Sequence, residues 1–518
     1  MGKITYTTMS ADDPALHQAY EEGLAAATAQ IGQTHPLLID GEKRFTEETY
    51  VERSPIDSEV VVGIYSQASD NDVDDAIATA RAFQPEWEAT PWQERVAIVR
   101  RAAEIMEEET PLLAGFLSLE IGKNRLEALG DVSEGAAFAH YYCDWLEEAA
   151  GLERAMGAYG VGDTNRSVLR PWGVWAIISP FNFPMALVSS PTSAALLTGN
   201  TVVLKPSNTG ALGSMLLADI FYRAGLPSGA LQVITGGDGA GDRLAHSDDV
   251  DGVTFTGSYE VGMYLYRTVA ASRPKPVVCE MGGKNPAVVT ASADLDLAAE
   301  GVMRAAFGLS GQKCSANSRV YVERPAFEEF VDLLTQKTAE IEVGDPRQRE
   351  VFLGPVIDQE AVERFRSAVA EVRDAGGEVL AGGEVVTDGD LARGNFLQPT
   401  VVTAPQESWV WEKELFVPFV AVTAVDSLDE GIDKSNDTIF GLTAGVFAGT
   451  DEEVDRFFQR IEAGVVYANR RAGSTTGAWP DIQPFGGWKG SGTSGAGSGG
   501  PWYMRSYVRE QARTLIRE

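Results

Sequence analysis

The first 150 residues repeat apolar positions at the spacing of a helix. Apolar side chains return every three or four residues in segments 12–31, 70–87 and 90–122. Ser, Thr or Asp residues that can cap a helix stand at the amino ends of these segments. This pattern predicts that the amino-terminal part of the chain is mostly helical.

The pattern changes near residue 170 to short apolar runs that end in Gly, Ser or Pro. Amphipathic stretches such as 210–225 separate these runs. Such alternation predicts the strands and helices of a parallel, doubly wound sheet. A second set of runs after residue 282 predicts a second α/β domain. The runs of the two sets are residues 173–180, 200–207, 231–237 and 250–258, then 286–290, 318–323 and 421–426.

Composition and charge narrow the class of protein. The chain has 518 residues, of which 44% are hydrophobic and 9% aromatic, as is typical of a packed globular enzyme of two or three domains. Its 75 acidic and 42 basic residues give a net charge of −33, so nucleic acid and anionic membranes are poor partners. Because salt screens the self-repulsion of such a chain, we expect a halophilic protein; an ordinary acidic cytosolic enzyme is the alternative.

Cysteine and histidine usage excludes two kinds of site. Three cysteines are too few for a disulfide framework, which indicates a reducing compartment. The amino terminus has no apolar leader segment and no long apolar run follows, so a cytoplasmic protein is expected. The histidines are scattered and no cysteine pair has ligand spacing, so neither a metal site nor a Cys-His hydrolase is expected. These residues are Cys143, Cys279, Cys314, His17, His35, His140 and His246.

Three polar residues stand where chemistry can be done. Cys314 lies among small residues beside Lys313 and Ser315, where nearby donors can lower the pKa of a thiol and make it a nucleophile; a buried, inert cysteine is the alternative. Glu280 ends a strand-like run before a Gly-Gly turn, a place that suits a general base. Asn182 lies at a strand end between two prolines and can direct an amide donor toward an oxyanion.

Seven motifs together resemble the aldehyde dehydrogenase superfamily, in its order and approximate spacing, from about residue 40 to the carboxyl terminus. They are ISPFNFP, TVVLKPS, FTGS, CEMGGKNP, GQKCSANSR, EKELF and PFGGWKGSG. The resemblance implies an α/β fold of the aldehyde dehydrogenase type, with two doubly wound parallel-sheet domains and a small β oligomerisation arm that makes a homo-oligomer. The expected parts are an NAD-binding domain (1–157 and 174–281), a catalytic domain (282–488) and the arm (158–173 and 489–518).

The same resemblance implies roles for individual residues. Cys314 is the expected nucleophile and Glu280 the general base, while Asn182 and the backbone amide of Cys314 form the oxyanion hole. Thiolate attack on an aldehyde gives a thiohemiacetal, hydride leaves to the nicotinamide, and Glu280 activates the water that hydrolyses the thioester. The presence of Glu280 favours hydrolysis over acyl transfer to coenzyme A.

The resemblance also implies how a dinucleotide binds. The motif G-x-G-x-x-G is absent from residues 236–242, as it is in the family. Asn208 stands where the family usually has a glutamate that selects NAD, and we expect NAD, with NADP as the alternative. The implied contacts are Lys205 and Ser207 for the adenosine ribose, Ser258 for the pyrophosphate, and Glu414 and Phe416 for the nicotinamide end.

Within the superfamily the chain is most similar to the stand-alone Δ1-pyrroline-5-carboxylate dehydrogenases, which oxidise L-glutamate γ-semialdehyde to L-glutamate in proline breakdown. The alternatives are another acidic semialdehyde (α-ketoglutarate or succinate semialdehyde) and a non-catalytic protein on this scaffold. The chain departs from the family at Val417, where glycine is usual, at Ala137 and His140, and in a loop about three residues longer before Gly477. The implied substrate contacts are Ser315, Gly477, Ala478, Phe183, Phe485 and Glu134.

Overall fold

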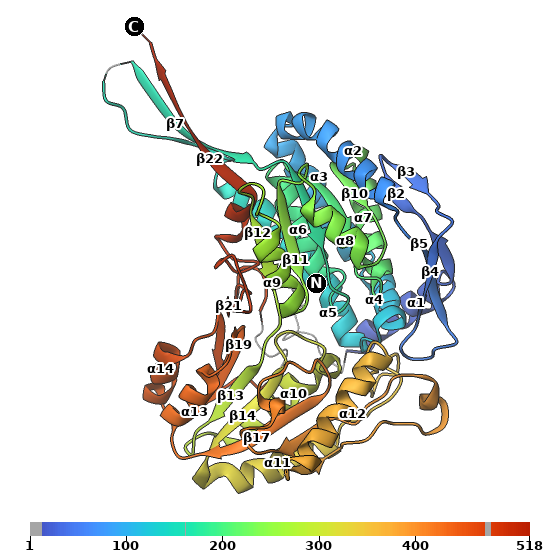
Figure 1. Cartoon of the computed structure of the whole chain (residues 1–518), viewed down its shortest axis with the longest axis vertical. Coiled ribbons are helices and arrows are strands. Elements are labelled where there is room, and N and C mark those ends of the chain that lie inside the picture. The colour runs from blue at the N-terminus through green and yellow to red at the C-terminus, as the bar shows by residue number, and fades with distance from the viewer. Residues whose placement is uncertain (1–12, 161, 472–477, 518) are drawn as a thin grey trace.

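The computed structural model describes residues 13–160, 162–471 and 478–517. Figure 1 shows two bodies, each built around one large sheet, and an extended pair of strands that projects from the first body. The chain forms the first body, crosses once near residue 281 to form the second, and returns to the first with its last thirty residues.

The first body contains a seven-stranded sheet in the order β12-β11-β8-β9-β10-β2-β3, whose first five strands are parallel. Successive residues of β8 point to opposite faces: Trp175 packs with one set of helices and Val174 with the other. Both faces are therefore covered, which explains the continuous apolar runs in the sequence. The strands are β12 (Val277–Glu280), β11 (Gly252–Thr256), β8 (Val174–Ile178), β9 (Thr201–Lys205), β10 (Leu231–Val233), β2 (Leu37–Ile39) and β3 (Glu42–Arg44).

Nine helices cover this sheet. The predicted helix 90–122 is two helices, because the helical turn ends at Glu109 and Pro111 starts a new one. One face carries α1 (Pro14–Thr28), α3 (Trp92–Glu108), α4 (Thr110–Ile121), α5 (Arg125–Glu148), α6 (Ala186–Leu197) and α7 (Ala211–Arg223). The other carries α2 (Asp70–Ala89), α8 (Asp238–His246) and α9 (Tyr259–Thr268).

The second body repeats the plan with the strand order β15-β16-β17-β14-β13-β19-β20, parallel except for β15. Its strands are β15 (Glu378–Ala381), β16 (Thr400–Thr403), β17 (Phe419–Val425), β14 (Asn317–Glu323), β13 (Asn285–Val289), β19 (Thr443–Phe447) and β20 (Val465–Ala468). Helices α10 (Leu295–Phe307) and α11 (Phe327–Ala339) pack on one face. Helices α12 (Gln359–Asp374), α13 (Leu428–Asn436) and α14 (Asp451–Arg460) pack on the other.

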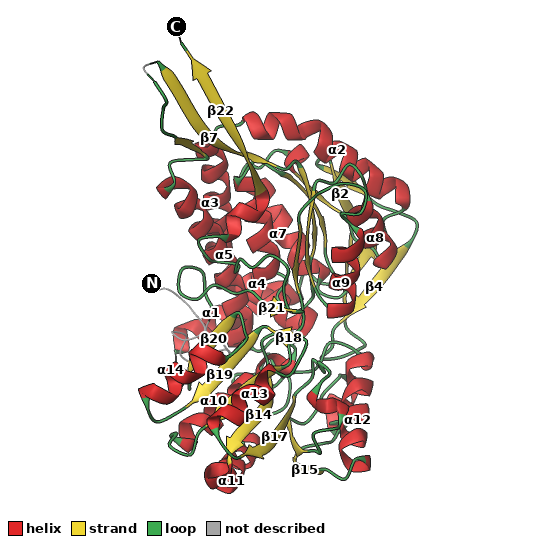
Figure 2. Ribbon diagram, turned by 60° about the vertical axis from the view of Figure 1, so that its left-hand side comes forward, coloured by secondary structure: helices red, strands yellow, loops and turns green. Residues whose placement is uncertain are grey.

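Three small sheets complete the part of the chain that the structure describes. One joins β1 (Gln33–His35), β5 (Val61–Ser66) and β4 (Thr49–Arg53), and another joins β18 (Phe440–Gly441) and β21 (Trp488–Lys489). The third joins β22 (Val508–Ile516), β7 (Asp163–Pro171) and β6 (Glu153–Ala155), and projects from the first body (Figure 2).

The projecting sheet differs from the expected arm in two respects. It includes β6, which precedes the predicted range 158–173. Residues 489–507, expected in the arm, lie outside it: Lys489 pairs with Phe440 of β18, and Tyr503 and Tyr507 of the short helix η6 (Tyr503–Tyr507) are buried against the core of the first body. Buried aromatic side chains anchor this segment, so in the tail only residues from Val508 onward pair with β7.

Candidate active site

A cavity of about 1230 Å³ lies between the two bodies. The carboxyl ends of β8, β9, β11 and β12 form one side, and Cys314 with the segment 412–416 forms the other. Parallel sheets place their ligands at this edge because strand ends and helix starts meet there. The predicted site residues that line the cavity are Cys314, Glu280, Asn182, Lys205, Ser207, Ser258, Glu414, Phe416 and Phe485.

A tight turn presents Cys314 to the cavity. Leu309, Ser310 and Gly311, in the short helix η2 (Gly308–Gly311), have positive φ angles of 49°, 54° and 71°. Such a run is unfavourable without outside support. The support includes a hydrogen bond from Leu309 N to Glu127 Oε1 (2.6 Å) and one from Ser310 Oγ to Gly354 O (2.7 Å).

Asn182 lies beside the same turn. Its Nδ2 donates to Gln312 O at 3.0 Å, and the side chain is 3% exposed. Gln312 is itself fixed, since its Oε1 accepts from Ile357 N at 2.8 Å. Gln312 precedes Cys314 by two residues, so this hydrogen bond holds the Asn182 amide close to the cysteine. An amide in that position could donate to an oxyanion formed on the cysteine.

Glu280 ends β12 within the cavity. Burial raises the pKa of this carboxyl to about 8, while the backbone N–H of Gly487 acts in the opposite direction. Its Oε2 has no hydrogen-bond partner among the described residues. A carboxyl with a pKa close to the working pH and a free oxygen can take a proton from water.

The pKa of the Cys314 thiol corrects the sequence-based expectation. Burial raises this pKa, and the carboxylates of Glu414 and Glu280 raise it further. The backbone N–H groups of Ser315 and Cys314 act in the opposite direction but are outweighed. The thiol is therefore held protonated, first by its burial and then by two carboxylates that are distant in sequence.

Glu414 reaches into the catalytic centre. Its Oε1 accepts from Gly283 N at 3.0 Å, and a Cβ on Gly282 would stand 2.1 Å from its Oε2. Burial raises the pKa of Glu414 to about 7. In the same segment the positive φ falls on Phe416 (56°) and not on Val417, so the valine at the family's glycine position causes no backbone strain.

The other end of the cavity suits an adenosine ribose. Lys205 is 6% exposed and its Nζ donates to Pro206 O at 3.0 Å, while burial lowers its pKa to about 8. Ser258 caps α9 and accepts from Val261 N. From β10 across to β12 the strand ends span about 19 Å at the usual strand spacing. A buried cation and a cavity of this length fit an extended dinucleotide.

The predicted substrate residues divide into two groups. Phe485 lines the cavity, whereas Ser315, Phe183 and Glu134 are not among its lining residues. Ser315 is buried, and its carbonyl accepts from Thr443 Oγ1 at 3.4 Å. Ala478 is half-buried, and Gly477 lies outside the described residues.

A buried charged cluster collects several of these positions behind the thiol. Lys123 Nζ lies 3.7 Å from the centre of the Phe183 ring and 2.9 Å from Asp131 Oδ2. Glu134 acts on the charge of Lys123, and Glu127 on that of Lys313, the residue before Cys314. Burial lowers the pKa of both lysines. Both signs of charge are therefore present within the protein near Cys314.

Sequence reasoning missed two parts of this site. Asp238 lines the cavity beside Lys205 and Ser207, and its position just after the apolar run 231–237 was the available signal. The cluster of Lys123 and Asp131 had no such signal, because two oppositely charged residues eight apart in a helical region are normally solvent-exposed.

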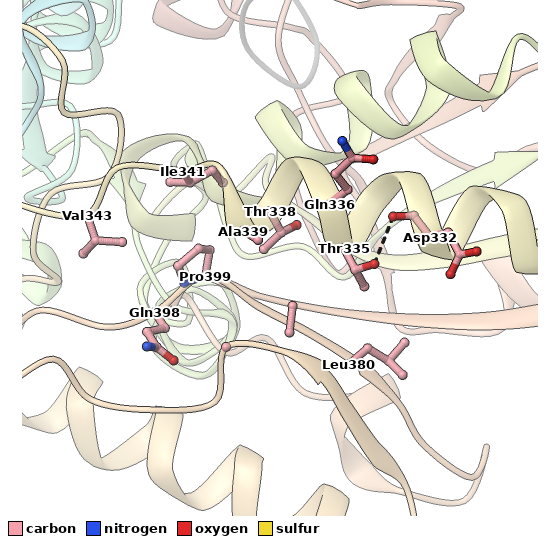
Figure 3. A pocket seen from close by; sticks show the side chains of 12 residues that line it. Asp332, Thr335, Gln336, Thr338, Ala339, Ile341, Val343, Leu380, Gln398 and Pro399 are labelled. Atoms are coloured by element: carbon pink, nitrogen blue, oxygen red, sulfur yellow. Dashed lines mark hydrogen bonds between the residues drawn. The ribbon is translucent and has the colours of Figure 1, made fainter.

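A second cavity, of about 590 Å³, lies in the second body between α11 and β15. Figure 3 shows its side chains, including Thr335, which donates to Asp332 O at 3.0 Å. None of the predicted site residues lines it. Within the described ranges no group of three or more His, Cys, Asp or Glu residues could hold a metal ion. No described helix is both long and apolar enough to span a membrane.

The sequence and the fold correspond to one family. Residues 43–512 match the aldehyde dehydrogenase family, and the chain belongs to it. A protein of Anoxybacillus flavithermus named 1-pyrroline-5-carboxylate dehydrogenase is 35% identical over 508 residues, which cover 96% of each chain. A Halalkalibacterium halodurans protein, 1-pyrroline-5-carboxylate dehydrogenase 1, is 35% identical over 506 residues, again 96% of each.

A solved structure has nearly the same fold. The 1-pyrroline-5-carboxylate dehydrogenase from Thermus with bound NAD superposes with a TM-score of 0.93 at 30% identity, covering 100% of this chain and 99% of that one. The fold predicted from sequence, two doubly wound sheets with a small β arm, is confirmed.

Proposed function

We propose that this aldehyde dehydrogenase oxidises L-glutamate γ-semialdehyde to L-glutamate, with Cys314 as nucleophile and NAD as the hydride acceptor. The observation that carries the proposal is the convergence of Cys314, Glu280 and Asn182 on one cavity from separate parts of the chain. The names of the 35% identical relatives support the choice of substrate.

The residues supply each step that the protein must perform. Cys314 Sγ gives its proton to water and attacks the aldehyde carbon as a thiolate, and the resulting oxyanion would accept hydrogen bonds from Asn182 Nδ2 and the backbone N–H of Cys314. Bound NAD supplies the acceptor for the hydride that leaves this carbon. Glu280 then takes a proton from water, and the hydroxide cleaves the thioester to release the carboxylic acid and the thiol.

The chain's own side chains define where NAD would lie. Lys205 and Ser207 would hold the adenosine ribose, Ser258 the pyrophosphate, and Glu414 with Phe416 the nicotinamide end; all five line the cavity. In this assignment the first body binds the cofactor and the second body supplies the nucleophile.

The charged cluster supports an amino-acid substrate. The far end of glutamate semialdehyde carries an ammonium and a carboxylate, which need partners of both charges. Lys123 and Lys313 with Glu127 and Glu134 provide both signs near the thiol. Ser315, Gly477, Ala478, Phe183 and Phe485 complete the proposed substrate contacts.

A homo-oligomer in the cytoplasm belongs to the same proposal. Leu515 and Ile516 of β22 are 49% and 67% exposed, and a projecting strand with apolar ends is suited to pair with another subunit. The three free cysteines support a reducing compartment. In a variant whose chain ends after Tyr507, the mass measured by light scattering should fall from that of an oligomer to that of a single chain. An oligomer of unchanged subunit number would contradict the role of the strand.

A substrate panel tests the reaction. We expect NADH formation with glutamate semialdehyde at a kcat/KM well above those with succinate and α-ketoglutarate semialdehydes, and none with Cys314→Ala. A higher kcat/KM for either competitor would reject the substrate, while inactivity toward all three would reject the enzymatic role.

A further inference from the structure

The adenosine end of the cavity contains a carboxylate from a second element. Lys205 is the last residue of β9 and Ser207 follows it, while Asp238 is the first residue of α8, the helix after β10. Strands β9 and β10 are parallel neighbours, with Leu204 paired to Val233. The segments after them therefore meet at one sheet edge, and all three side chains line the cavity.

Lys205 and Asp238 line the same end of the cavity and interact electrostatically. The lysine chain runs along α8, since its Cδ is 3.3 Å from where a Cβ on Gly241 would stand. Asp238 is a charge that acts on the buried ammonium. Asp238 itself is exposed at the cavity rim, so a ligand on Lys205 meets both charges.

Asn208, at the position where the family usually has a glutamate that selects NAD, does not face the ribose end of the cavity. Asn208 does not line the cavity, and its Oδ1 is buried without a hydrogen-bond partner among the described residues. The carboxylate that faces the ribose end is therefore on α8 and not three residues after the lysine.

We propose that Asp238 is the specificity-determining residue that admits a dinucleotide with a free ribose 2′-hydroxyl and rejects one with a 2′-phosphate. This inference rests on the proposed function. A carboxylate accepts a hydrogen bond from a ribose hydroxyl, whereas a phosphate there meets like charge. The charge of Lys205 alone would favour the 2′-phosphate. The Asp238 carboxylate therefore determines whether the 2′-hydroxyl or the 2′-phosphate is preferred.

Binding of AMP and of adenosine 2′,5′-bisphosphate to the full-length protein tests this directly by calorimetry, without catalysis. The wild type should prefer AMP. Asp238→Asn should shift the ratio of dissociation constants toward the bisphosphate by about tenfold at low salt, and by less at about 1 M KCl, where screening is strong. Rates with NADP relative to NAD should shift in the same direction.

Asp242→Asn is the matched control, because Asp242 lies one turn further along α8, loses the same charge and does not line the cavity. It should keep the wild-type ratio. An unchanged ratio in Asp238→Asn, an equal shift in Asp242→Asn, or a wild-type preference for the bisphosphate would each overturn the inference alone. Failure of the wild type to bind either nucleotide would also overturn the NAD assignment.

Discussion

At the scale of single residues, Glu414 is expected to control the reactivity of the Cys314 thiol. Its carboxylate is the first charge, after burial, that raises the pKa of Cys314. Removing a negative charge stabilises the thiolate, so Glu414→Gln should lower this pKa and shift the pH profile of iodoacetamide alkylation to lower pH, by about one unit. Glu412→Gln, a neighbouring cavity residue with the same charge change, should leave the profile in place; equal shifts in both variants would contradict a specific effect.

Glu280 predicts a pH dependence of the second half of the reaction. Because its pKa is about 8, the fraction of molecules in which Glu280 is ionised and can accept a proton increases as the pH rises through that value. Thioester hydrolysis should therefore accelerate between about pH 7 and about pH 9. Rapid-mixing measurements should show a burst of NADH in Glu280→Gln followed by turnover about 10² to 10⁴ times slower than wild type. Loss of the burst itself would place Glu280 earlier in the reaction.

Sequence reasoning succeeded where chemistry is encoded locally. Cys314, Glu280 and Asn182 each stand in a short motif at a turn or strand end, so their types and places could be read directly. The direction of the thiol pKa was wrong, because it depends on burial and on Glu414, which is distant in sequence. Asp238 was missed for the same reason: its role follows from the pairing of β9 and β10.

At the scale of elements, the turn η2 is the clearest departure from what local sequence predicts. Gly311 has a φ of +71°, and a Cβ there would stand 2.2 Å from Val417 O. Gly376 has a similar φ of +82°, but a Cβ there would have no atom within 4 Å. Gly311→Ala should therefore lower the free energy of unfolding by at least about 1 kcal/mol more than Gly376→Ala does.

Urea unfolding and kcat should be measured for both glycine variants. The comparison separates the cost of the positive φ angle from the cost of the close contact with Val417 O. Gly376→Ala, just after α12, should lose about 1 to 2 kcal/mol and keep its activity. Gly311→Ala should lose activity as well, because the turn positions Cys314. Equal costs for the two variants would show that the contact with Val417 relaxes freely.

Strands and helices with clear periodicity were predictable, and irregular parts were not. The run 200–207 contains β9, whose residues are all buried, because continuous apolar runs have few alternatives in an α/β protein. The burial of Tyr503 and Tyr507 depends on contacts distant in sequence, whereas the break at Glu109 had a local signal in Pro111, which the continuous apolar periodicity masked. The substrate end was the least predictable part, since Ser315 and Phe183 border a charged cluster that only the fold assembles.

At the scale of the whole molecule, we expect the net negative charge to lower the stability of the folded state when the salt concentration is low. A charge of −33 leaves many carboxylates without a cation, so self-repulsion weakens the compact state at low salt. The halophilic character stays a prediction. The thermal midpoint should rise steeply up to about 1 M KCl, where the Debye length is about 3 Å, and level off above it. Sucrose, which stabilises by exclusion without screening, should not reproduce the steep part; an identical response would contradict charge repulsion as the cause.

The return of the tail to the first body has a consequence for how the protein is made. Tyr503, Met504 and Tyr507 belong to the same core as the helices that precede residue 224, so that core cannot close until residue 507 has left the ribosome. The whole second body is synthesised while the first is still incomplete. The cavity between the two bodies, which Tyr503 also lines, therefore takes its final form only after residue 507 has been synthesised.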